Sequence, residues 1–218
     1  MPHVPDQVLE LLRGRRSVRR FRPEPVPAAM LDEVLEAARW APTAGNRQSF
    51  RLLVVTAAPV IAAMGAAVRA ETARLRAALR PEMAGQVGAY LGSFEHFTGA
   101  PAVVVTIYRP GLDLLAAATG VAGASDRPER DALASAAAVT TYLLLAAHAA
   151  GLGTCWMTGP CVAAEALREV LQVPAGWSIA ALVPVGFPAE APAAPPRRPL
   201  AQLVLRRGPT SEGDGGGA

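Results

Sequence analysis

Residues 38–55 read ARWAPTAGNRQSFRLLVV, and they decide the fold class of this chain. They begin inside a segment, 26–42, whose apolar residues recur at helical spacing: Leu31, Val34, Leu35 and Ala38. Pro42 ends this predicted helix, and the turn-forming residues 43–49 separate it from a short buried strand at 50–56. A helix followed so closely by a buried strand predicts a mixed fold.

The other segments are predicted to be mostly helical around a small sheet. Residues 100–108, rich in valine, and residues 178–188 have the composition of two further strands. Apolar patterning predicts helices over 4–12, 59–97 (two or three helices), 131–150 and 162–173. Residues 109–130 are expected to form a loop that could close over a site. The predicted fold class is α+β, with a small mixed or antiparallel sheet flanked by helices.

The length and composition predict one folded domain with a short tail. The chain has 218 residues, of which 51% are hydrophobic, so it can bury a sizeable core. We expect a single domain over 1–207 and a disordered tail over 208–218. The first predicted helix is expected to place four apolar side chains on its buried side: Val8, Leu9, Leu11 and Leu12.

Positive charge is concentrated in the stretch GRRSVRRFRPEPVP, residues 14–27. It holds five arginines within eight residues: Arg15, Arg16, Arg19, Arg20 and Arg22. Such a cluster suits a nucleic-acid backbone, a lipid headgroup or a small phosphorylated ligand, although a solvated charged helix end remains an alternative. The net charge of +3 is mild for a nucleic-acid-binding protein, which disfavours the first of these ligands.

The cysteines and the start of the chain favour a reducing compartment. Cys155 and Cys161 fit neither a disulfide framework nor a four-ligand zinc site. Nothing in the sequence activates Cys155 as a nucleophile, so we expect a buried small hydrophobic residue. The first residues show no signal-peptide pattern, and the cytoplasm is the expected location.

Residues 132–164 contain no Asp, Glu or Arg, which raises the possibility of a membrane span. However, the segment is rich in alanine, carries several polar side chains and breaks at GLG, residues 151–153. A helix that is apolar all round can equally lie in a protein core or in a dimer interface. We therefore expect a buried helix and no membrane partner.

Three polar segments could hold a ligand: the arginine cluster, the loop APTAGNRQSF (41–50) and the arm PPRRP (195–199). Guanidinium groups bind phosphate in a bidentate manner, and Ser17 adds a hydroxyl donor. The amides of Asn46 and Gln48 suit the polar edge of a flat ring, although 43–49 could also be a plain turn. The stretch GLGTCW departs from the GxGxxG pattern and follows a helix, so it is not read as a dinucleotide fingerprint.

Together, RRSVRRF (15–21), ARWAPTAGNRQSFRLLVV (38–55) and GLGTCWMTGP (151–160) resemble the FMN-dependent nitroreductase family in order and spacing. The resemblance covers roughly residues 8–204. It implies a nitroreductase-like fold, an intertwined homodimer, FMN as cofactor and NADH or NADPH as electron donor. The implied reaction is a ping-pong hydride transfer to a nitroaromatic, a quinone or a related small acceptor.

The resemblance also assigns the candidate cofactor-binding residues. The FMN phosphate, ribityl chain and pyrimidine edge are matched by Arg15, Arg16, Ser17 and Arg19. The loop that a partner subunit lays against the flavin is matched by Pro42, Thr43, Ala44, Gly45, Asn46 and Gln48. Thr158 and Gly159 match the backbone beside the flavin N5, and Arg197 or Arg198 matches the basic residue that closes on the phosphate. No catalytic side chain and no metal ligand are assigned.

Some features differ from the family pattern or stay open. Gln48-Ser49-Phe50 stands where the family often has Gln-Pro-Trp, and a further flavin contact could come from Ser93 or His96. An alternative function is a flavin-dependent oxidase or reductase of a specialised natural-product or cofactor biosynthetic pathway. A more remote alternative is a non-catalytic nucleic-acid-binding protein, whose affinity would fall steeply with salt.

Overall fold

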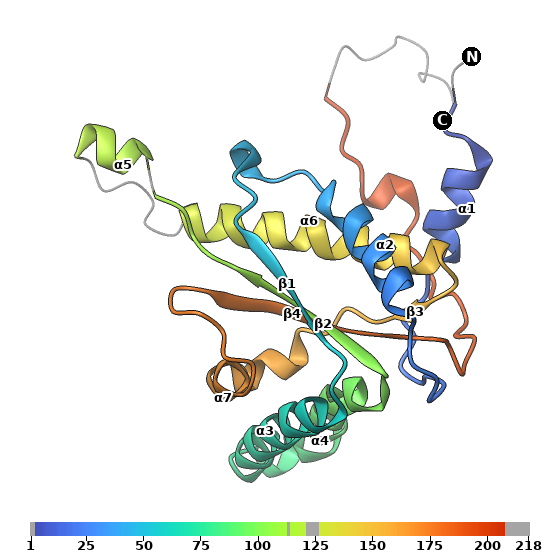
Figure 1. The fold of residues 1–218 in the computed structure, drawn as a ribbon, viewed down its shortest axis with the longest axis vertical. Helices are drawn as coiled ribbons and strands as arrows, with labels where there is room; N and C mark the ends of the chain where they lie inside the picture. The colour runs from blue at the N-terminus through green and yellow to red at the C-terminus, as the bar shows by residue number, and fades with distance from the viewer. Residues whose placement is uncertain (1–2, 113, 121–126, 208–218) are drawn as a thin grey trace, which may run out of the picture.

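Four strands form one antiparallel sheet in the order β1-β2-β4-β3, with helices on both faces (Figure 1). The strands are β1 (Phe50–Val55), β2 (Ala102–Tyr108), β3 (Gly153–Thr154) and β4 (Ser178–Gly186). The computed structural model describes residues 3–112, 114–120 and 127–207; the predicted tail, 208–218, lies outside them. The α+β prediction is confirmed, and the sheet is antiparallel throughout.

The centre of the sheet is apolar on both faces because helices cover both. Every residue of β2 is buried, which explains its unbroken run of apolar residues around Thr106. Val105 lies opposite Leu53 on one side and Leu182 on the other. The two-residue strand β3 was missed by the sequence analysis, because so short a strand leaves no periodicity to read.

One face of the sheet is covered by α3 (Ala58–Ala77), α4 (Ala84–Gly92) and α7 (Ala164–Val170), drawn below it in Figure 1. Two short 3₁₀ helices, η3 (Ser93–Gly99) and η4 (Gly159–Ala163), complete this layer. Its core contains large side chains that are almost fully buried: Met64, Phe97, Ile107, Leu167 and Leu182.

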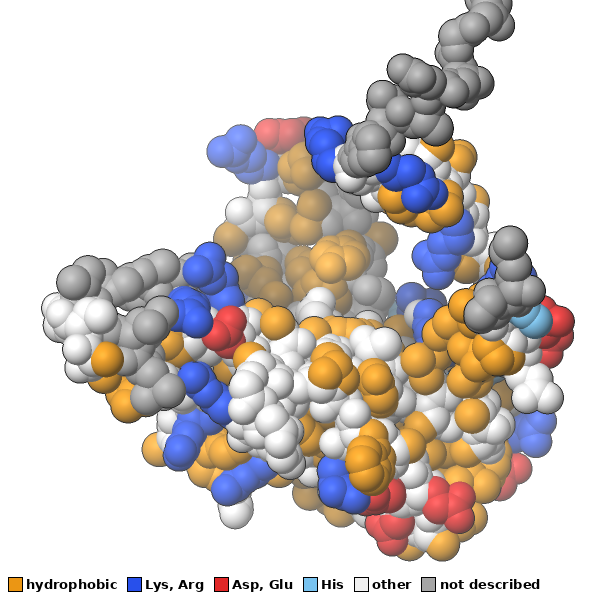
Figure 2. All heavy atoms as spheres, turned by 90° about the horizontal axis from the view of Figure 1, so that it is seen from above, with side chains coloured by type: hydrophobic (Ala, Val, Ile, Leu, Met, Phe, Trp, Pro, Cys, Tyr) orange, Lys and Arg blue, Asp and Glu red, His pale blue; other side chains and the backbone are white. Residues whose placement is uncertain are grey.

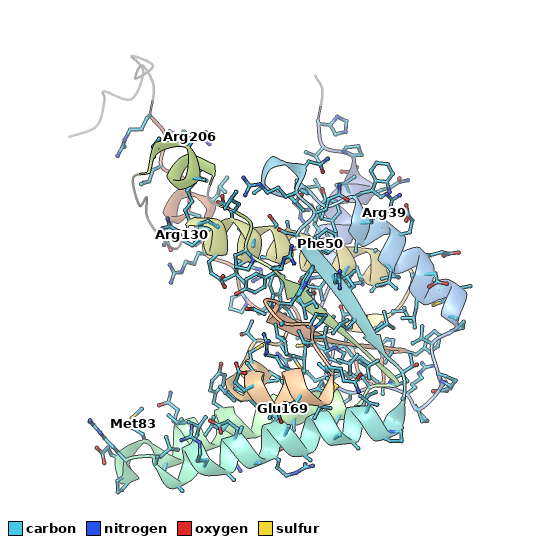
Figure 3. All side chains as sticks on the ribbon, turned by 60° about the vertical axis from the view of Figure 1, so that its left-hand side comes forward. Arg39, Phe50, Met83, Arg130, Glu169 and Arg206 are labelled. Carbon is cyan, nitrogen blue, oxygen red and sulfur yellow. The ribbon has the colours of Figure 1, made fainter. Side chains whose placement is uncertain are left out.

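The opposite face is covered by α2 (Ala28–Arg39) and α6 (Arg127–Ala149). The predicted buried face of α2 is confirmed for Leu31, Val34 and Ala38, while Leu35 is half-buried against the same core. Figure 3 shows Arg39, at the end of α2, on the opposite side of the sheet from Glu169 of α7. The chain therefore forms three layers, with the sheet in the middle.

Helix α6 is a core helix, as expected for the charge-free segment. It is long and apolar enough to cross a bilayer, yet 44% of its apolar window is buried inside the protein. Its Thr140 hydroxyl lies 3.0 Å from that of Thr106 on β2, which satisfies both buried polar groups. The helix begins at Arg127, four residues before the predicted start.

Two expectations are wrong. Residues 109–130 are not one loop, because α5 (Leu114–Thr119) lies within them; residues 113 and 121–126 are outside the described part. No residue of α1 (Asp6–Gly14) is buried, and Val8 and Leu12 are 44% and 52% exposed. Periodicity identifies the apolar face of a helix without identifying what covers it.

The remaining 3₁₀ helices are η1 (Ala44–Asn46), η2 (Pro81–Met83) and η5 (Leu200–Gln202).

A matched pair of methionine variants tests this core. Met64 on α3 is fully buried, whereas Met83 of η2 is 44% exposed. We expect Met64→Ala to lower the free energy of unfolding by about 2–5 kcal/mol, because it removes a packed side chain and leaves a cavity. Met83→Ala is expected to change it by less than about 0.5 kcal/mol. Urea unfolding measures both, and equal losses would contradict the assigned core.

Candidate functional site

Residues 15–22, which carry the arginine cluster and are called the arginine segment below, lie along β3, the edge strand of the sheet. The Val18 N–H donates to the Thr154 carbonyl oxygen at 2.8 Å, and Ser17 pairs with Thr154 in a parallel bridge. A Cβ added to Gly153 would lie 2.8 Å from Cγ1 of Val18, so this close approach requires glycine. The backbone of the arginine segment is therefore fixed against the sheet.

The chain that follows β4 packs against the same segment. The Arg22 N–H donates to the Phe187 carbonyl at 2.9 Å, and the Ala189 N–H donates to the Arg20 carbonyl at 3.0 Å. Glu190 adds three contacts through its carboxylate. One oxygen accepts the backbone N–H groups of Arg19 at 2.7 Å and Arg20 at 3.1 Å, and the other accepts the Arg20 Nε–H at 2.9 Å.

These contacts make Glu190 the anchor of residues 191–207, which we call the C-terminal arm. Hydrogen bonds from the backbone of Arg19, and then from the Arg20 side chain and backbone, lower the pKa of Glu190 below its usual value. The carboxylate is therefore ionised at neutral pH and bonds to the outer side of the arginine segment. Residues 191–199 continue from this anchor across the remaining arginines.

A cavity of about 370 Å³ lies between the arginine segment and the arm. Its lining is Arg15, Arg16, Ser17, Arg19, Pro192, Ala193, Pro195 and Arg197. We call it the arginine pocket. Four guanidinium groups and one hydroxyl, without a carboxylate in the lining, match the charge and the acceptor oxygens of a phosphate group. The lining includes Arg197 and not its neighbour Arg198.

His148, at the end of α6, lies beneath this pocket. A Cβ added to Gly14 would be 2.9 Å from its Nε2 atom, so the half-buried ring packs against the backbone just before Arg15. Burial lowers the pKa of His148, and the positive charges of Arg15 and Arg16 lower it further. The imidazole is therefore neutral at neutral pH and adds no charge beneath the arginines.

Thr158 and Gly159 follow β3 on a backbone held from two sides. Met157 exchanges two backbone hydrogen bonds of 2.9 Å with Leu182 of β4. A Cβ on Gly159 would lie 2.3–2.9 Å from ring atoms of the buried Phe94, so glycine is required there too. The Thr158 side chain is exposed. The packing of Phe94 against Gly159 and the Met157–Leu182 pair therefore fix the backbone at this position.

The two cysteines are not poised for nucleophilic chemistry. Burial raises the pKa of the Cys155 thiol, although Arg19 and Ser17 act in the opposite direction. Burial also raises the pKa of Cys161 to about 11. Both groups remain thiols at neutral pH, as expected for buried cysteines.

The loop 42–48 has a rigid, unusual backbone. Gly45, Asn46 and Gln48 adopt positive φ angles of 58°, 50° and 48°. The Thr43 hydroxyl accepts the Gln48 N–H at 3.1 Å, and the Ala44 N–H donates to the Ser135 hydroxyl of α6 at 3.0 Å. Left-handed backbone at two non-glycine residues is uncommon and typical of functional loops.

The structure does not bring this loop to the arginine pocket within one chain. Ser135, which holds the loop, and His148, which lies beneath the pocket, are 13 residues apart on α6. At 1.5 Å per residue the two positions are about 20 Å apart. No residue of the loop lines the pocket. Of the predicted site residues, the structure therefore gathers Arg15, Arg16, Ser17, Arg19 and Arg197, while the loop lies at the other end of the helix.

Comparison with known proteins identifies the family of this chain. The model of the Nitroreductase family matches residues 12–187, from the end of α1 to the end of the sheet. The chain belongs to the Nitroreductase family. An NADH dehydrogenase of Thermus thermophilus is 33% identical over 215 residues, which cover 88% of this chain and 92% of that protein. A 5,6-dimethylbenzimidazole synthase of Rhodobacter capsulatus is 28% identical over 194 residues, which cover 84% of each chain.

A solved structure confirms the nitroreductase-like fold. The crystal structure of a nitroreductase with bound FMN from Desulfitobacterium hafniense superposes with a TM-score of 0.70 at 22% identity. The match covers 94% of this chain and all of that chain. The layers described above are therefore those of a nitroreductase-like fold.

No local sequence pattern marks the contacts that Glu190 and Phe94 make in this region. Glu190 carries the arm, yet it stands in a proline-rich stretch without any periodic pattern. Its one visible signal was its position as the acid between the last strand and the arginines of the arm. The flavin contact expected from Ser93 or His96 stays a prediction: Ser93 donates to the Tyr90 carbonyl, His96 is exposed, and Phe94 between them packs against Gly159.

Replacing the anchor tests its role in this member of the Nitroreductase family. We expect Glu190→Ala to speed hydrogen–deuterium exchange at the amides of Arg19 and Arg20, because both donate to the lost carboxylate. Since the folded-state pKa of Glu190 is lowered, its stabilising contribution is complete above the ordinary value of 4.5. That contribution is lost as the pH falls through the lower folded-state value, so wild type and variant should converge in acid.

Glu165→Ala is the control for this test. Glu165 is 93% exposed on α7 and lies 3.8 Å from Arg168, far in sequence from the arginine segment. This variant should leave exchange at Arg19 and Arg20 unchanged. Unaltered exchange in Glu190→Ala at neutral pH, or a difference that grows in acid, would show that Glu190 does not hold the arm.

Proposed function

We propose that this chain takes electrons from NADH or NADPH and passes them to nitroaromatic, quinone or related small acceptors in two successive half-reactions. As a member of the Nitroreductase family it is an FMN-dependent oxidoreductase. The observation that carries the proposal is the arginine pocket beside β3, since its residues fit the phosphate of FMN.

We propose that the arginine pocket binds the FMN phosphate through Arg15, Arg19 and Arg197. Charge-assisted hydrogen bonds from guanidinium groups to phosphate oxygens are short and strong. The Ser17 hydroxyl can add one more donor, and Arg16 is placed to meet the polar edge of the ring system. Arg16 lines the pocket, and its Nη1 atom donates to the carbonyls of Arg13 and Arg15, which fixes the position of the guanidinium group.

When bound, FMN supplies the hydride-accepting and hydride-donating chemistry. In our proposal the protein orients the ring system and excludes water. We assign the backbone of Thr158 and Gly159 to the side of the ring, and the packing of Phe94 against Gly159 holds that backbone in place. No side chain is assigned as a general acid or base.

A second copy of the chain is needed to bring the loop 42–48 to the pocket, so we propose a homodimer. Exposed apolar side chains support this. Val8 and Leu12 lie on one face of α1, with Val4 just before the helix, and Leu133 and Tyr142 are exposed on opposite sides of α6. The C-terminal arm exposes four more: Leu200, Leu203, Val204 and Leu205. Burial of such a set against a second copy is favourable, at about 25 cal/mol per Å² of apolar area.

The intracellular setting belongs to the same proposal. Two free cysteines and the requirement for a nicotinamide donor suit the reducing cytoplasm. The partners we propose are a second copy, the donor and a small acceptor.

Anaerobic titration tests the proposed activity. The purified protein is loaded with FMN, and the visible flavin spectrum is followed as NADH and then NADPH is added. We expect bleaching by at least one donor and recovery of the spectrum when a nitroaromatic or quinone is added. A bound flavin that neither donor reduces would contradict the reductase proposal and would point to another reaction of the family.

The same preparation tests the pocket. Each of Arg19→Ala and Arg197→Ala should weaken FMN binding at least about tenfold, because a lost hydrogen bond to a charged group costs about 1.5–3 kcal/mol. Arg74→Ala is the matched control, since Arg74 pairs with Glu71 on the outside of α3. Fluorescence quenching of free FMN measures all three, and equal affinities would remove the pocket from the proposal.

The dimer is tested with two substitutions at positions of equal exposure. Leu133 on α6 and Met83 in η2 are both 44% exposed in the single chain. Leu133→Asp should shift the protein to monomer in sedimentation and reduce bound FMN, because it places a charge in the proposed interface. Met83→Asp should leave the dimer intact. A wild-type monomer that binds FMN fully would overturn the dimer.

A further inference from the structure

Two arginines lie over one tryptophan at the end of the sheet opposite the arginine pocket. Trp177 precedes β4, and the register that pairs Tyr108 with Ser178 brings Arg109 and Trp177 side by side. The guanidinium carbon of Arg51 lies 4.5 Å from the Trp177 ring centroid, and that of Arg109 lies 5.8 Å from it. Arg51 is on β1, so three neighbouring strands contribute to this group.

Arg47 extends the group from the loop 42–48. A Cβ added to Gly111 would be 3.0 Å from its Nη1 atom, so the guanidinium group lies against the backbone two residues after Arg109. We call Arg47, Arg51, Arg109 and Trp177 the tryptophan–arginine site. Figure 2 shows arginine side chains collected along the left flank of this view of the molecule.

The charges of this site are not neutralised by the protein that the structure describes. No ion pair to Arg47, Arg51 or Arg109 occurs among the described residues, whereas Arg20, Arg39 and Arg74, for example, each bond to a carboxylate. The carboxylate of Glu129 accepts the Tyr108 hydroxyl at 2.5 Å, and that of Asp131 lies 4.0 Å from Arg127, so neither forms an ion pair with the three arginines of this site. Like charges held close together repel, so a bound anion would stabilise the arrangement.

The site is also held in shape. Trp177 is only 8% exposed, and its carbonyl accepts a hydrogen bond from the Arg168 side chain. Stacking over the ring positions the Arg51 guanidinium group while its N–H donors stay available, and Arg51, Arg109 and Arg47 are all exposed. Several guanidinium groups with free donors match the geometry and charge of a phosphate group.

We propose that the tryptophan–arginine site binds a phosphate group of a small ligand at a position distinct from the arginine pocket. The choice of ligand rests on the proposed function. In the proposed dimer the loop 42–48 lies against the partner's cofactor, so a phosphate held by Arg47 belongs to a molecule that reaches that cofactor. Two sources share this chemistry: the 2′-phosphate of NADPH, and an acceptor that carries a phosphate.

Binding is tested without any need for catalysis. The FMN-loaded protein is titrated calorimetrically with inorganic phosphate and with adenosine 2′,5′-bisphosphate, at constant ionic strength because screening weakens exposed charges. Wild type is compared with Arg51→Gln/Arg109→Gln, with Arg47→Gln and with the control Arg39→Gln. We expect at least about tenfold weaker binding in the first variant, weaker binding in the second and no change in the control.

Arg47→Gln keeps the proposal testable if the double variant folds poorly, since Arg47 lies on the surface against Gly111. If FMN does not bind to the wild type, the proposed function fails. The titration is then repeated on Arg19→Ala, whose arginine pocket is impaired, and phosphate binding there would still support the second site. Equal phosphate binding by wild type, Arg47→Gln and a folded double variant would overturn the proposal.

Steady-state kinetics distinguish the two sources of phosphate. If the 2′-phosphate of the donor is the ligand, the KM for NADPH should rise about tenfold in Arg47→Gln while the KM for NADH stays unchanged. If phosphate binding is weakened but both donors keep their KM values, the site binds a phosphorylated acceptor. Either result supports the phosphate site and assigns its ligand.

Discussion

Helix α6 sets the distance between the loop 42–48 and the arginine pocket, and the whole site depends on that distance. One of its faces packs against the sheet through Val139, Leu143 and Ala147, so the helix cannot shift along it without loss of the core. Ser135 near its start holds the loop 42–48, and His148 at its end supports the backbone of the arginine segment. The two halves of the proposed cofactor site are thereby kept about 20 Å apart in one chain. A rigid helix between them leaves a second copy as the simplest means of joining them.

The role of each arginine depends on whether a carboxylate lies close enough to pair with it. The chain has no lysine, so every exposed positive side chain other than histidine is a guanidinium group. Where an acid is close, as in the pairs of Arg39 with Glu36 and Arg74 with Glu71, the arginine covers a helix surface. At the arginine pocket, Glu190 bonds to the backbone of Arg19 and to Arg20, and it does not line the pocket. The pocket thus gains an anchored wall without losing its positive charge.

Helices and strands with a local apolar pattern can be predicted from the sequence, whereas contacts between residues far apart in the sequence cannot. Helix α2 was predicted from apolar residues at helical spacing, and strands β1, β2 and β4 were predicted from short apolar runs rich in β-branched residues. The anchor at Glu190 joins residues 171 positions apart, and no local pattern records such a contact. The same reason hid Gly159 against Phe94 and the stacking of Arg51 on Trp177. The arginine pocket could be predicted in part, because several of its arginines are adjacent in sequence, whereas its wall from the C-terminal arm required the fold.

Symmetry connects the two ends of α6. If two copies pack through the uncovered faces of this helix about a two-fold axis perpendicular to it, the helices run antiparallel and the start of one lies near the end of the other. The loop 42–48 of each copy then approaches the arginine pocket of its partner, with Arg47 at its outer edge. The loop reaches the partner with a backbone fixed by positive φ angles, and the backbone that it meets is fixed by Gly153 against Val18 and by Gly159 against Phe94. In that arrangement the arginine side chains near both ends of α6 chiefly supply positive charge to the ligands.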